Sequence, residues 1–186
     1  NGKYILEDIA KSVKERMQRD TLTLEDIVGL GIGVPGPVKE DGTVLKCANL
    51  GWGVFNVADT VRELTGIENV KVGNDANVAA LGEMWQGGGK GYSNLVAVTL
   101  GTGVGGGIII DGRILTGTNG AGGEIGHIHI EDAETETCGC KNKGCLEQYA
   151  SATGITRLAN RRLAKDDAPS MLRGGEISAK TVFDAV

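Results

Sequence analysis

The sequence predicts an α/β fold, and three observations support this. Segments rich in β-branched residues alternate with segments whose apolar residues recur at helical spacing, the order typical of mixed strand–helix domains. The chain has 186 residues, of which 40% are hydrophobic, enough for a buried core. Its 31 glycines exceed the average share of about 7%, and they cluster between the β-rich segments, where tight turns are expected.

The first half of the chain is predicted to contain helices separated by short strands. Apolar residues recur every four positions from Ile5 to Met17, which indicates an amphipathic helix over about 3–18. The apolar run 27–34 is predicted to be a buried strand that ends at the Pro-Gly-Pro segment 35–37. The further predicted elements are a turn at 40–42, a helix over 54–65, a strand over 69–73 and a helix over 75–86.

The second half begins with two β-rich runs, 94–100 and 104–110, which a Gly-Thr-Gly turn joins. The elements predicted after them are a glycine-rich loop over 116–126, a short strand over 125–130, a helix over 146–163 interrupted near Gly154, and a helix from 179 to 186. The chain begins with a helix and stops inside a helical pattern. We therefore expect it to be part of a longer protein.

The charge balance excludes several classes of partner. The chain has 19 Lys and Arg against 24 Asp and Glu, a net charge of -5, whereas nucleic-acid and anionic membrane surfaces attract basic proteins. The sequence has no apolar run of about 18 residues and no basic segment followed by an apolar one at its start. We expect a cytoplasmic protein with no nucleic-acid or membrane partner.

Three of the four cysteines, Cys138, Cys140 and Cys145, lie within eight residues of one another. In a cytosolic protein such a cluster indicates metal binding before disulfides, although ordinary buried thiols are the alternative. Gly139 and Gly144 are expected to let the backbone fold back so that the three sulfur atoms converge.

A tetrahedral zinc ion needs a fourth ligand, and the chain offers two histidines. His127 lies eleven residues before Cys138 and is the natural candidate. Alternation along the predicted strand places His129 on the same face, so spacing alone does not decide between them. A site with four protein ligands and no open position is structural.

Asn74 to Asn77 lie where a predicted strand meets a predicted helix. Ligands of open α/β sheets bind at this end of a strand, so Asp75 is a plausible general base for a hydroxyl group. Asp and Asn are also the preferred helix N-caps, and the tetrapeptide alone favours that alternative.

Two glutamates flank the predicted metal ligands. If zinc joins His127 to Cys145, it also brings Glu124 and Glu147 into one neighbourhood. Carboxylates, an imidazole and an amide can satisfy the hydroxyl groups of a sugar. The alternative for each glutamate is a solvent-exposed charge.

The glycine-rich turn at Gly101, Thr102 and Gly103 could direct backbone N–H groups toward a phosphate. It leads into a strand rather than a helix and lacks Gly-Lys-Ser/Thr, so it is neither a dinucleotide fingerprint nor a P-loop. A hairpin with glycine-rich packing is equally consistent with the pattern.

Five segments together resemble the ROK family of sugar kinases and sugar-responsive repressors. In order they are GIGVPGP at 31–37, NDAN at 74–77, LGTGVGGG at 100–107, GGEIGH at 122–127, and the cysteine segment with GCLE at 138–147. The resemblance covers about 27–157, and the segment 145–154 looks most like the glucokinase branch of Gram-positive bacteria.

The resemblance implies a ribonuclease-H-like ATPase fold of the actin and hexokinase type, here partial, with sugar and ATP between two lobes. Residues 1–36 would be the remainder of the N-terminal lobe, and 37–186 the sugar- and zinc-binding C-terminal lobe, truncated at its end. The implied function is ATP-dependent phosphorylation of a hexose, with glucose the first choice. The alternative is the effector domain of a sugar-sensing repressor.

The resemblance also implies a role for each site residue. Asp75 would take the proton of the sugar 6-hydroxyl, and Gly101, Thr102 and Gly103 would contact the phosphates of ATP, which is used with Mg²⁺. The residues implied to hold the sugar are Asn74, Asp75, Glu124, His127 and Glu147. By analogy, His127 rather than His129 would also bind the structural zinc, together with Cys138, Cys140 and Cys145.

The chain departs from the family pattern in two respects. Lys141 stands where many members have glycine. Family kinases begin with a strand and an Asp-x-Gly-Gly-Thr phosphate loop that this chain lacks, so we assign phosphate transfer to a full-length protein rather than to the chain alone. Family members are commonly dimers or tetramers, and we expect a homo-oligomer.

Overall fold

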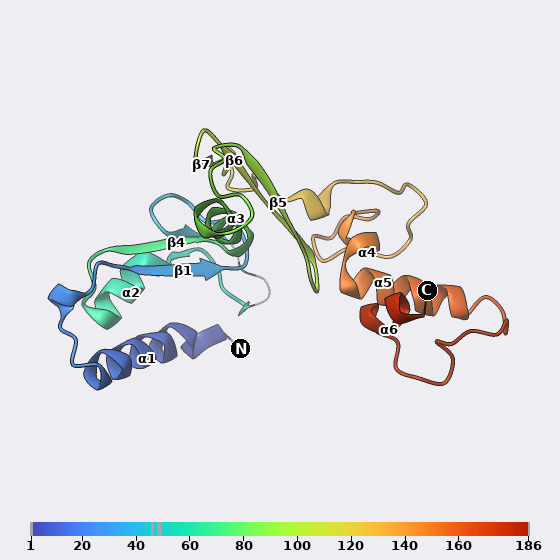
Figure 1. The fold of residues 1–186 in the computed structure, drawn as a ribbon, viewed down its shortest axis with the longest axis horizontal. Helices are drawn as coiled ribbons and strands as arrows, with labels where there is room; N and C mark the ends of the chain where they lie inside the picture. Colours follow the sequence, from blue (N-terminus) through green and yellow to red (C-terminus); the bar gives the residue numbers. More distant parts are fainter. Residues whose placement is uncertain (1, 46, 48–49, 186) are drawn as a thin grey trace.

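The computed structural model describes residues 2–45, 47 and 50–185. Figure 1 shows an elongated molecule in which α1, α2, α3 and the strands form a larger body, and residues 125–185 form a smaller one. The β5–β6 hairpin extends from the larger body, and its tip meets the smaller body beside α5.

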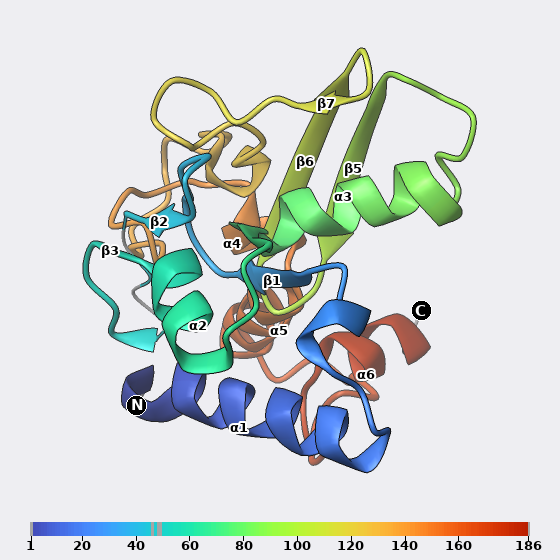
Figure 2. The same ribbon diagram turned by 90° about the vertical axis from the view of Figure 1, so that its left-hand side faces the viewer.

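The larger body begins with helices packed on a parallel strand pair. β1 and β4 pair in parallel from Leu30↔Val70 to Val34↔Asn74, and the chain between them supplies the crossover that a parallel pair requires. Figure 2 shows α1 below α2 and α3 across the hairpin strands. The elements are η1 (Gly2–Tyr4), α1 (Ile5–Arg19), η2 (Leu24–Asp26), β1 (Leu30–Val34), β2 (Thr43–Val44), β3 (Phe55–Asn56), α2 (Val57–Thr65), β4 (Val70–Asn74) and α3 (Asp75–Gln86).

The main apolar core lies between these helices and strands. Leu6 of α1, Val34 of β1, Val61 of α2 and Val70 of β4 are buried in one cluster. Residues on both sides of position 36 contribute to this cluster. The division into an N-terminal and a C-terminal lobe at that position stays a prediction.

A three-stranded antiparallel sheet follows, formed by β5 (Leu95–Leu100), β6 (Val104–Ile110) and β7 (Arg113–Ile114). Helix α3 packs so closely on β6 that a Cβ atom at Gly107 would lie 2.5 Å from Ala80 Cβ. On the opposite face of β6, a Cβ atom at Gly106 would lie 2.5 Å from the Gly123 carbonyl oxygen. Glycine therefore allows β6 to be covered from both sides at backbone distance.

Strand β5, at one edge of this sheet, has exposed apolar residues. Val96, Val98 and Leu100 of β5 are 59%, 52% and 68% exposed, and Trp85 of α3 is 73% exposed. Within the described residues, β5 pairs only with β6.

The smaller body is built from short helices and loops. Its elements are η4 (Ile125–His127), α4 (Glu147–Ala150), α5 (Ala152–Leu163) and α6 (Ala179–Asp184). Helix α5 packs against both α4 and α6. In the described part of the chain, no helix is both long enough and apolar enough to span a bilayer.

The structure corrects several predicted elements. The predicted strand over 125–130 is wrong, because η4 occupies its first half and an isolated bridge from His129 to Cys145 follows. The long helix over 146–163 breaks at Ser151 rather than Gly154, because the Ser151 side chain caps α5 by accepting a hydrogen bond from Gly154 N. Val186, in the last predicted helix, lies outside the described residues.

Candidate metal centre and adjoining ligand site

The four predicted metal ligands converge in the structure. The ligand atoms of His127, Cys138, Cys140 and Cys145 all lie within 4.8 Å of one another. The Cys140 and Cys145 Sγ atoms are 3.6 Å apart, and Cys138 Sγ lies 3.8 Å from His127 Nδ1. Tetrahedral zinc with Zn–S bonds of about 2.3 Å places its ligand atoms about 3.5–3.8 Å apart. The Cys140–Cys145 and Cys138–His127 separations fall in or near this range, and a set of one nitrogen and three sulfurs is a donor set that zinc accepts.

Two residues with positive φ shape the cysteine loop. Gly144 has φ +69°, and a Cβ atom there would lie 2.0 Å from the Glu131 carbonyl oxygen, so the turn requires glycine as predicted. Gly139 has no such requirement: its φ is not in the left-handed region, and a Cβ atom would meet nothing within 4 Å. The second left-handed residue is Lys141, with φ +74°.

The local backbone distinguishes the two histidines. His127 N donates to Glu124 O at 3.1 Å, the i→i+3 pattern of a 3₁₀ turn, so the strand alternation that placed both rings on one face does not exist. His127 directs Nδ1 toward Cys138, whereas His129 places Nδ1 2.9 Å from Lys143 O and Nε2 2.7 Å from Asp132 Oδ1. The structure therefore brings His127, and not His129, to the thiols.

The thiols differ in their tendency to ionise. Burial raises the pKa of Cys138, and burial together with the neighbouring Cys140 and Cys138 thiols raises the pKa of Cys145 to about 12. Burial opposes ionisation of Cys140 too, but hydrogen bonds from the Asn142 backbone and the Cys145 thiol lower its pKa overall. Three thiolates in this space require a bound cation, the condition that a zinc site meets.

Glu147, the first residue of α4, connects the metal loop to the hairpin. Its Oε1 lies 3.6 Å from Cys138 Sγ, and its Oε2 accepts a hydrogen bond from Val104 N at 2.9 Å. A Cβ atom at Gly103 would lie 2.4 Å from that Oε2 atom, so glycine makes room for the carboxylate. Glu147 thus lies between the cysteine cluster and the Gly101–Gly103 turn.

The start of α5 holds the other side of the same turn. Ala152 N donates to Gly101 O at 2.9 Å, and the Thr153 hydroxyl donates to Thr102 O. Two of the three residues predicted to meet a phosphate, Gly101 and Thr102, are therefore bonded to the start of α5.

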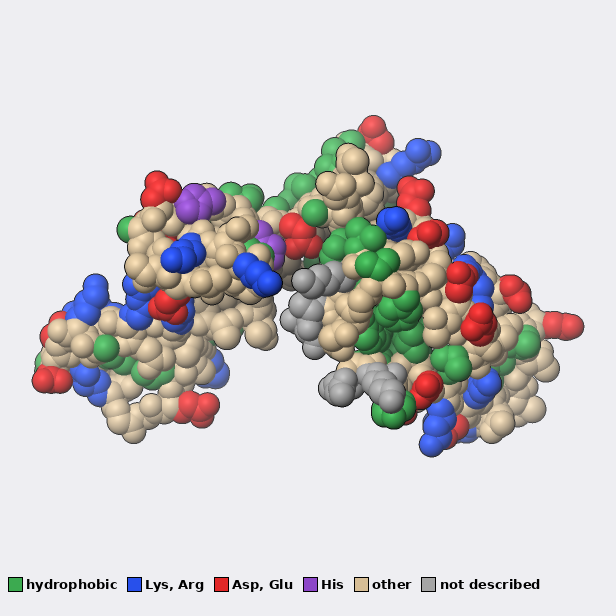
Figure 3. All heavy atoms as spheres, turned by 180° about the vertical axis from the view of Figure 1, so that it is seen from behind, with side chains coloured by type: hydrophobic (Ala, Val, Ile, Leu, Met, Phe, Trp, Pro, Cys, Tyr) green, Lys and Arg blue, Asp and Glu red, His purple; other side chains and the backbone are tan. Residues whose placement is uncertain are grey.

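Glu124 lies beside the other ring nitrogen of His127. Its Oε2 is 4.0 Å from His127 Nε2, and both side chains are about one-third exposed, at 38% and 34%. The imidazole thus faces the thiols with Nδ1 and a partly exposed carboxylate with Nε2. Figure 3 shows a hollow between the two bodies, with one of the two histidines (purple) at its rim.

Asn74 and Asp75 lie at the carboxyl end of β4, beside the end of β1. Asn74 is the N-cap of α3: its Oδ1 accepts from Asn77 N at 3.0 Å, and its Nδ2 donates to Gly36 O at 3.2 Å. The capping alternative therefore applies to Asn74. Asp75 is exposed, and within the described residues its carboxylate accepts one hydrogen bond, from Ala76 N at 2.8 Å.

Strand β6 contacts both the helix that begins at Asp75 and Glu147 beside the metal site. A Cβ atom at Gly105 would lie 3.0 Å from Ala76 Cβ, and the adjacent Val104 bonds Glu147. The first turn of α3 and Glu147 thus contact neighbouring residues of one strand.

A separate hollow of about 450 Å³ between α2 and β4 contains none of the predicted site residues.

Glu134 was not among the predicted site residues, and its buried carboxylate connects the segment before Cys138 to α4 and α5. The segment 131–136 that contains it is acidic and leads to Cys138. The available signal was the pair Arg157 and Arg161, which lie on one face of a predicted helix at i,i+4 spacing and could pair with a carboxylate of an acidic segment.

Comparison with known proteins shows the family of the chain. The family model described as "ROK family" matches residues 3–186, and the chain belongs to the ROK family. It is 42% identical to a glucokinase of Halalkalibacterium halodurans over 99% of the chain and 57% of that protein. It is also 41% identical to a xylose repressor of Caldicellulosiruptor bescii over 79% of the chain and 36% of that protein.

A solved ROK family glucokinase from Streptomyces griseus, in complex with glucose and AMPPNP, superposes with a TM-score of 0.69 at 35% identity. The match covers 87% of this chain and 51% of that protein. These findings confirm the predicted family and a partial fold of the actin and hexokinase type. The chain spans about half the length of the glucokinases that it matches.

Proposed function

We propose that the complete protein phosphorylates a hexose with ATP, and that glucose is the preferred substrate. The observation that carries this proposal is the position of Glu147, which contacts the metal cluster through one oxygen and the start of β6 through the other. A sugar site and a phosphate turn that share this carboxylate are adjacent, as transfer between them requires.

The sugar would bind beside the metal loop, at the rim of the hollow. Glu124 and Glu147 offer acceptors there, and His127 offers Nε2–H as a donor when Nδ1 binds the metal. Asn74 retains one amide hydrogen after its bonds to Asn77 and Gly36. Asp75 completes the set. Similarity to glucokinases supports glucose as the substrate.

Asp75 would act as the general base. As the sugar 6-oxygen attacks the γ-phosphorus, its proton passes to the Asp75 carboxylate and the bond from that phosphorus to the β–γ bridging oxygen breaks, releasing ADP. Phosphoryl transfer depends mostly on positioning and charge stabilisation, and such a base contributes about 10²–10⁴-fold. The exposure of Asp75 and its single local hydrogen bond leave it available for this role.

The turn Gly101–Gly103 would bind phosphates of ATP accompanied by Mg²⁺. A bound zinc ion would supply a structural cross-link between His127 and the cysteine loop, which fixes the imidazole by Nδ1 and leaves Nε2 toward the ligand side. We place the complete protein in the cytoplasm as a homo-oligomer.

The second candidate is a sugar-sensing effector domain of a repressor. The 41% identity to a xylose repressor favours it, because such a domain binds sugar without transferring phosphate. Both candidates share the metal and sugar residues, so only turnover separates them.

A coupled assay of ADP release by the complete protein across glucose, mannose, fructose and N-acetylglucosamine tests the proposal. We expect turnover with at least one of them and the highest kcat/KM with glucose. Sugar binding without ADP release would overturn the kinase proposal and favour the repressor, whereas turnover with another hexose would overturn only the choice of glucose.

A further inference from the structure

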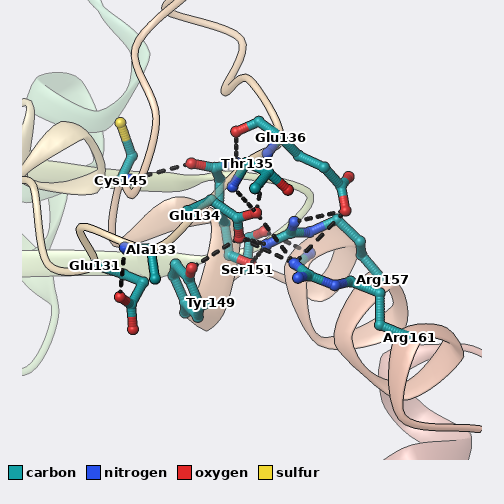
Figure 4. A network of polar contacts seen from close by, with 12 residues as sticks. Glu131, Ala133, Glu134, Thr135, Glu136, Cys145, Tyr149, Ser151, Arg157 and Arg161 are labelled. Atoms are coloured by element: carbon teal, nitrogen blue, oxygen red, sulfur yellow. Dashed lines mark hydrogen bonds and ion pairs between the residues drawn. The ribbon is translucent and has the colours of Figure 1, made fainter. Parts of the chain in front are cut away.

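Glu134 is a buried carboxylate outside the proposed substrate site. Its side chain is fully buried, and no other Asp or Glu among the described residues is buried. It accepts hydrogen bonds from Tyr149 Oη at 2.7 Å, Arg157 Nη2 at 2.8 Å and Arg161 Nη1 at 3.1 Å (Figure 4). The Arg157 hydrogen bond holds the pKa of Glu134 well below its usual range, so this group is charged at neutral pH.

These contacts fasten one segment to two helices. Tyr149 belongs to α4, Arg157 and Arg161 belong to α5, and Glu134 lies in the loop that leads to Cys138. Arg157 also donates to the Gln148 carbonyl oxygen at 3.0 Å and pairs with Glu136 Oε1 at 3.1 Å. Moving the loop before the cysteines would separate Glu134 from Arg157, whose side chains are fully buried and 20% exposed, respectively.

Gln148 extends the network to a metal ligand. Its buried side chain accepts from Cys145 N at 3.1 Å and donates to Glu136 O at 2.9 Å. The residue before it is Glu147. The network thus holds the chain on both sides of the cysteine loop and the backbone of the carboxylate that contacts Cys138 and Val104.

We propose that Glu134, paired with Arg157, is a positioning residue that holds the cysteine loop and Glu147 in place for metal and sugar. It touches neither ligand atoms nor the reacting groups, and it acts through Gln148 and Arg157. The part that concerns sugar rests on the proposed hexose kinase function. The part that concerns zinc does not.

The packing around the loop supports this role over a purely local contribution to stability. Cys138 and Cys145 are buried, but neither they nor the rest of 125–163 join the main apolar cluster. In this region the polar network takes the place of a core as the element that fixes the loop. Groups that orient metal ligands from outside the coordination sphere typically change metal affinity by about 10–100-fold.

The test is Glu134→Gln in the complete protein, with Asp166→Asn as the matched control. Asp166 pairs with Arg162 in an exposed ion pair at the end of α5. The measurements are zinc release to a chromophoric chelator, glucose KM and kcat, and the melting temperature. Glu134→Gln is expected to release zinc at least about 10-fold faster, and to raise the glucose KM by a similar factor with a smaller effect on kcat. The control should match wild type.

A lower melting temperature with unchanged zinc release and KM would show a structural role only and overturn the proposal. If Glu134→Gln does not fold, Tyr149→Phe, which removes one hydrogen bond to Glu134 and keeps both arginines, is measured in the same way with a smaller shift expected. Zinc release needs no catalysis. A wild-type protein without turnover would therefore refute the proposed function and leave this test intact.

Discussion

His127 and His129 are two residues apart, yet their ring nitrogens have different partners. His127 Nδ1 faces Cys138, and His129 is held by Lys143 O and Asp132. The sequence supplied both candidates, but the choice depended on a 3₁₀ turn that the alternating pattern of Ile and His concealed. Resemblance to the family favoured His127, the histidine that the structure places beside the thiols, where strand periodicity left both open.

This difference predicts an asymmetry in metal binding. His127→Ala should lose most of the zinc that wild-type protein retains, because three thiolates leave the tetrahedral site one ligand short. His129→Ala should keep about one zinc per chain. Elemental analysis of the purified variants checks this, and zinc loss in His129→Ala with retention in His127→Ala would reverse the assignment.

Lys141 occupies a left-handed backbone position, with φ +74°. This gives a physical reason for the glycine that many family members have there. A non-glycine residue with left-handed backbone angles costs about 1–2 kcal/mol of folding free energy. Glycine avoids this cost but loses more backbone entropy when the chain folds. We therefore expect Lys141→Gly to stabilise the folded protein by roughly 0.5–1 kcal/mol. Urea unfolding measures the change, and a destabilised variant would show that the Lys141 side chain contributes contacts that outweigh its strain.

At the scale of elements, helices and strands bounded by glycine were predicted well, and short connections were not. Helix α3 and strands β5 and β6 begin and end within about one residue of the prediction, because glycine-containing turns mark their ends. The segment 125–130 failed because Gly126 packs under the Val104 carbonyl oxygen, a contact from a distant strand that overrides a β-branched pattern.

Glu134, in the loop over 131–136, is expected to make the stability of the folded protein depend on pH. The pKa of Glu134 is lowered in the folded state, chiefly by Arg157, so its contribution to stability is fully present above the usual Glu range of about 4.3 and is lost as the pH falls toward the folded value. Wild type should therefore lose stability between about pH 5 and pH 3, and Glu134→Gln should lose less over the same range.

Urea unfolding of zinc-loaded protein at pH 7, 5 and 3.5 measures this difference. Zinc-loaded protein is used because Glu134 and its partners lie in the segment that zinc removal is expected to loosen, and the zinc content is measured at each pH because acid releases metal from thiolates. Glu63→Gln, on the exposed surface of α2, is the control and should follow wild type. A Glu134→Gln variant with the same acid sensitivity as wild type would show that Glu134 does not provide this stability.

At the scale of the whole molecule, the two bodies are stabilised differently. The larger body has an apolar core that includes Val44, Val57 and Val61, whereas residues 125–163 rely on the cysteine cluster and on the Glu134 network. The sequence predicted the fold class, and the four side chains that it suggested as metal ligands come together in the structure. It could not predict that β6 would connect the first turn of α3 to Glu147, because such contacts depend on which faces of a strand are covered.

This division predicts a local response to zinc removal. Chelation should increase amide hydrogen exchange over 125–163, where no large apolar core compensates, and leave α2 and β4 protected. Mass spectrometry of exchanged peptides, with and without chelator, checks this. Loss of protection throughout the chain at the same chelator concentration would show that metal and core form one cooperative unit.

We propose that a hexose hydroxyl binds next to the Asp75 carboxylate, beside the metal loop. The most direct test is the turnover of Asp75→Ala with glucose and ATP in the complete protein, with Asp59→Ala, at an exposed position in the first turn of α2, as the control. We expect kcat to fall at least about 100-fold in Asp75→Ala while glucose still binds, and the control to turn over like wild type. Near wild-type turnover in Asp75→Ala would contradict it.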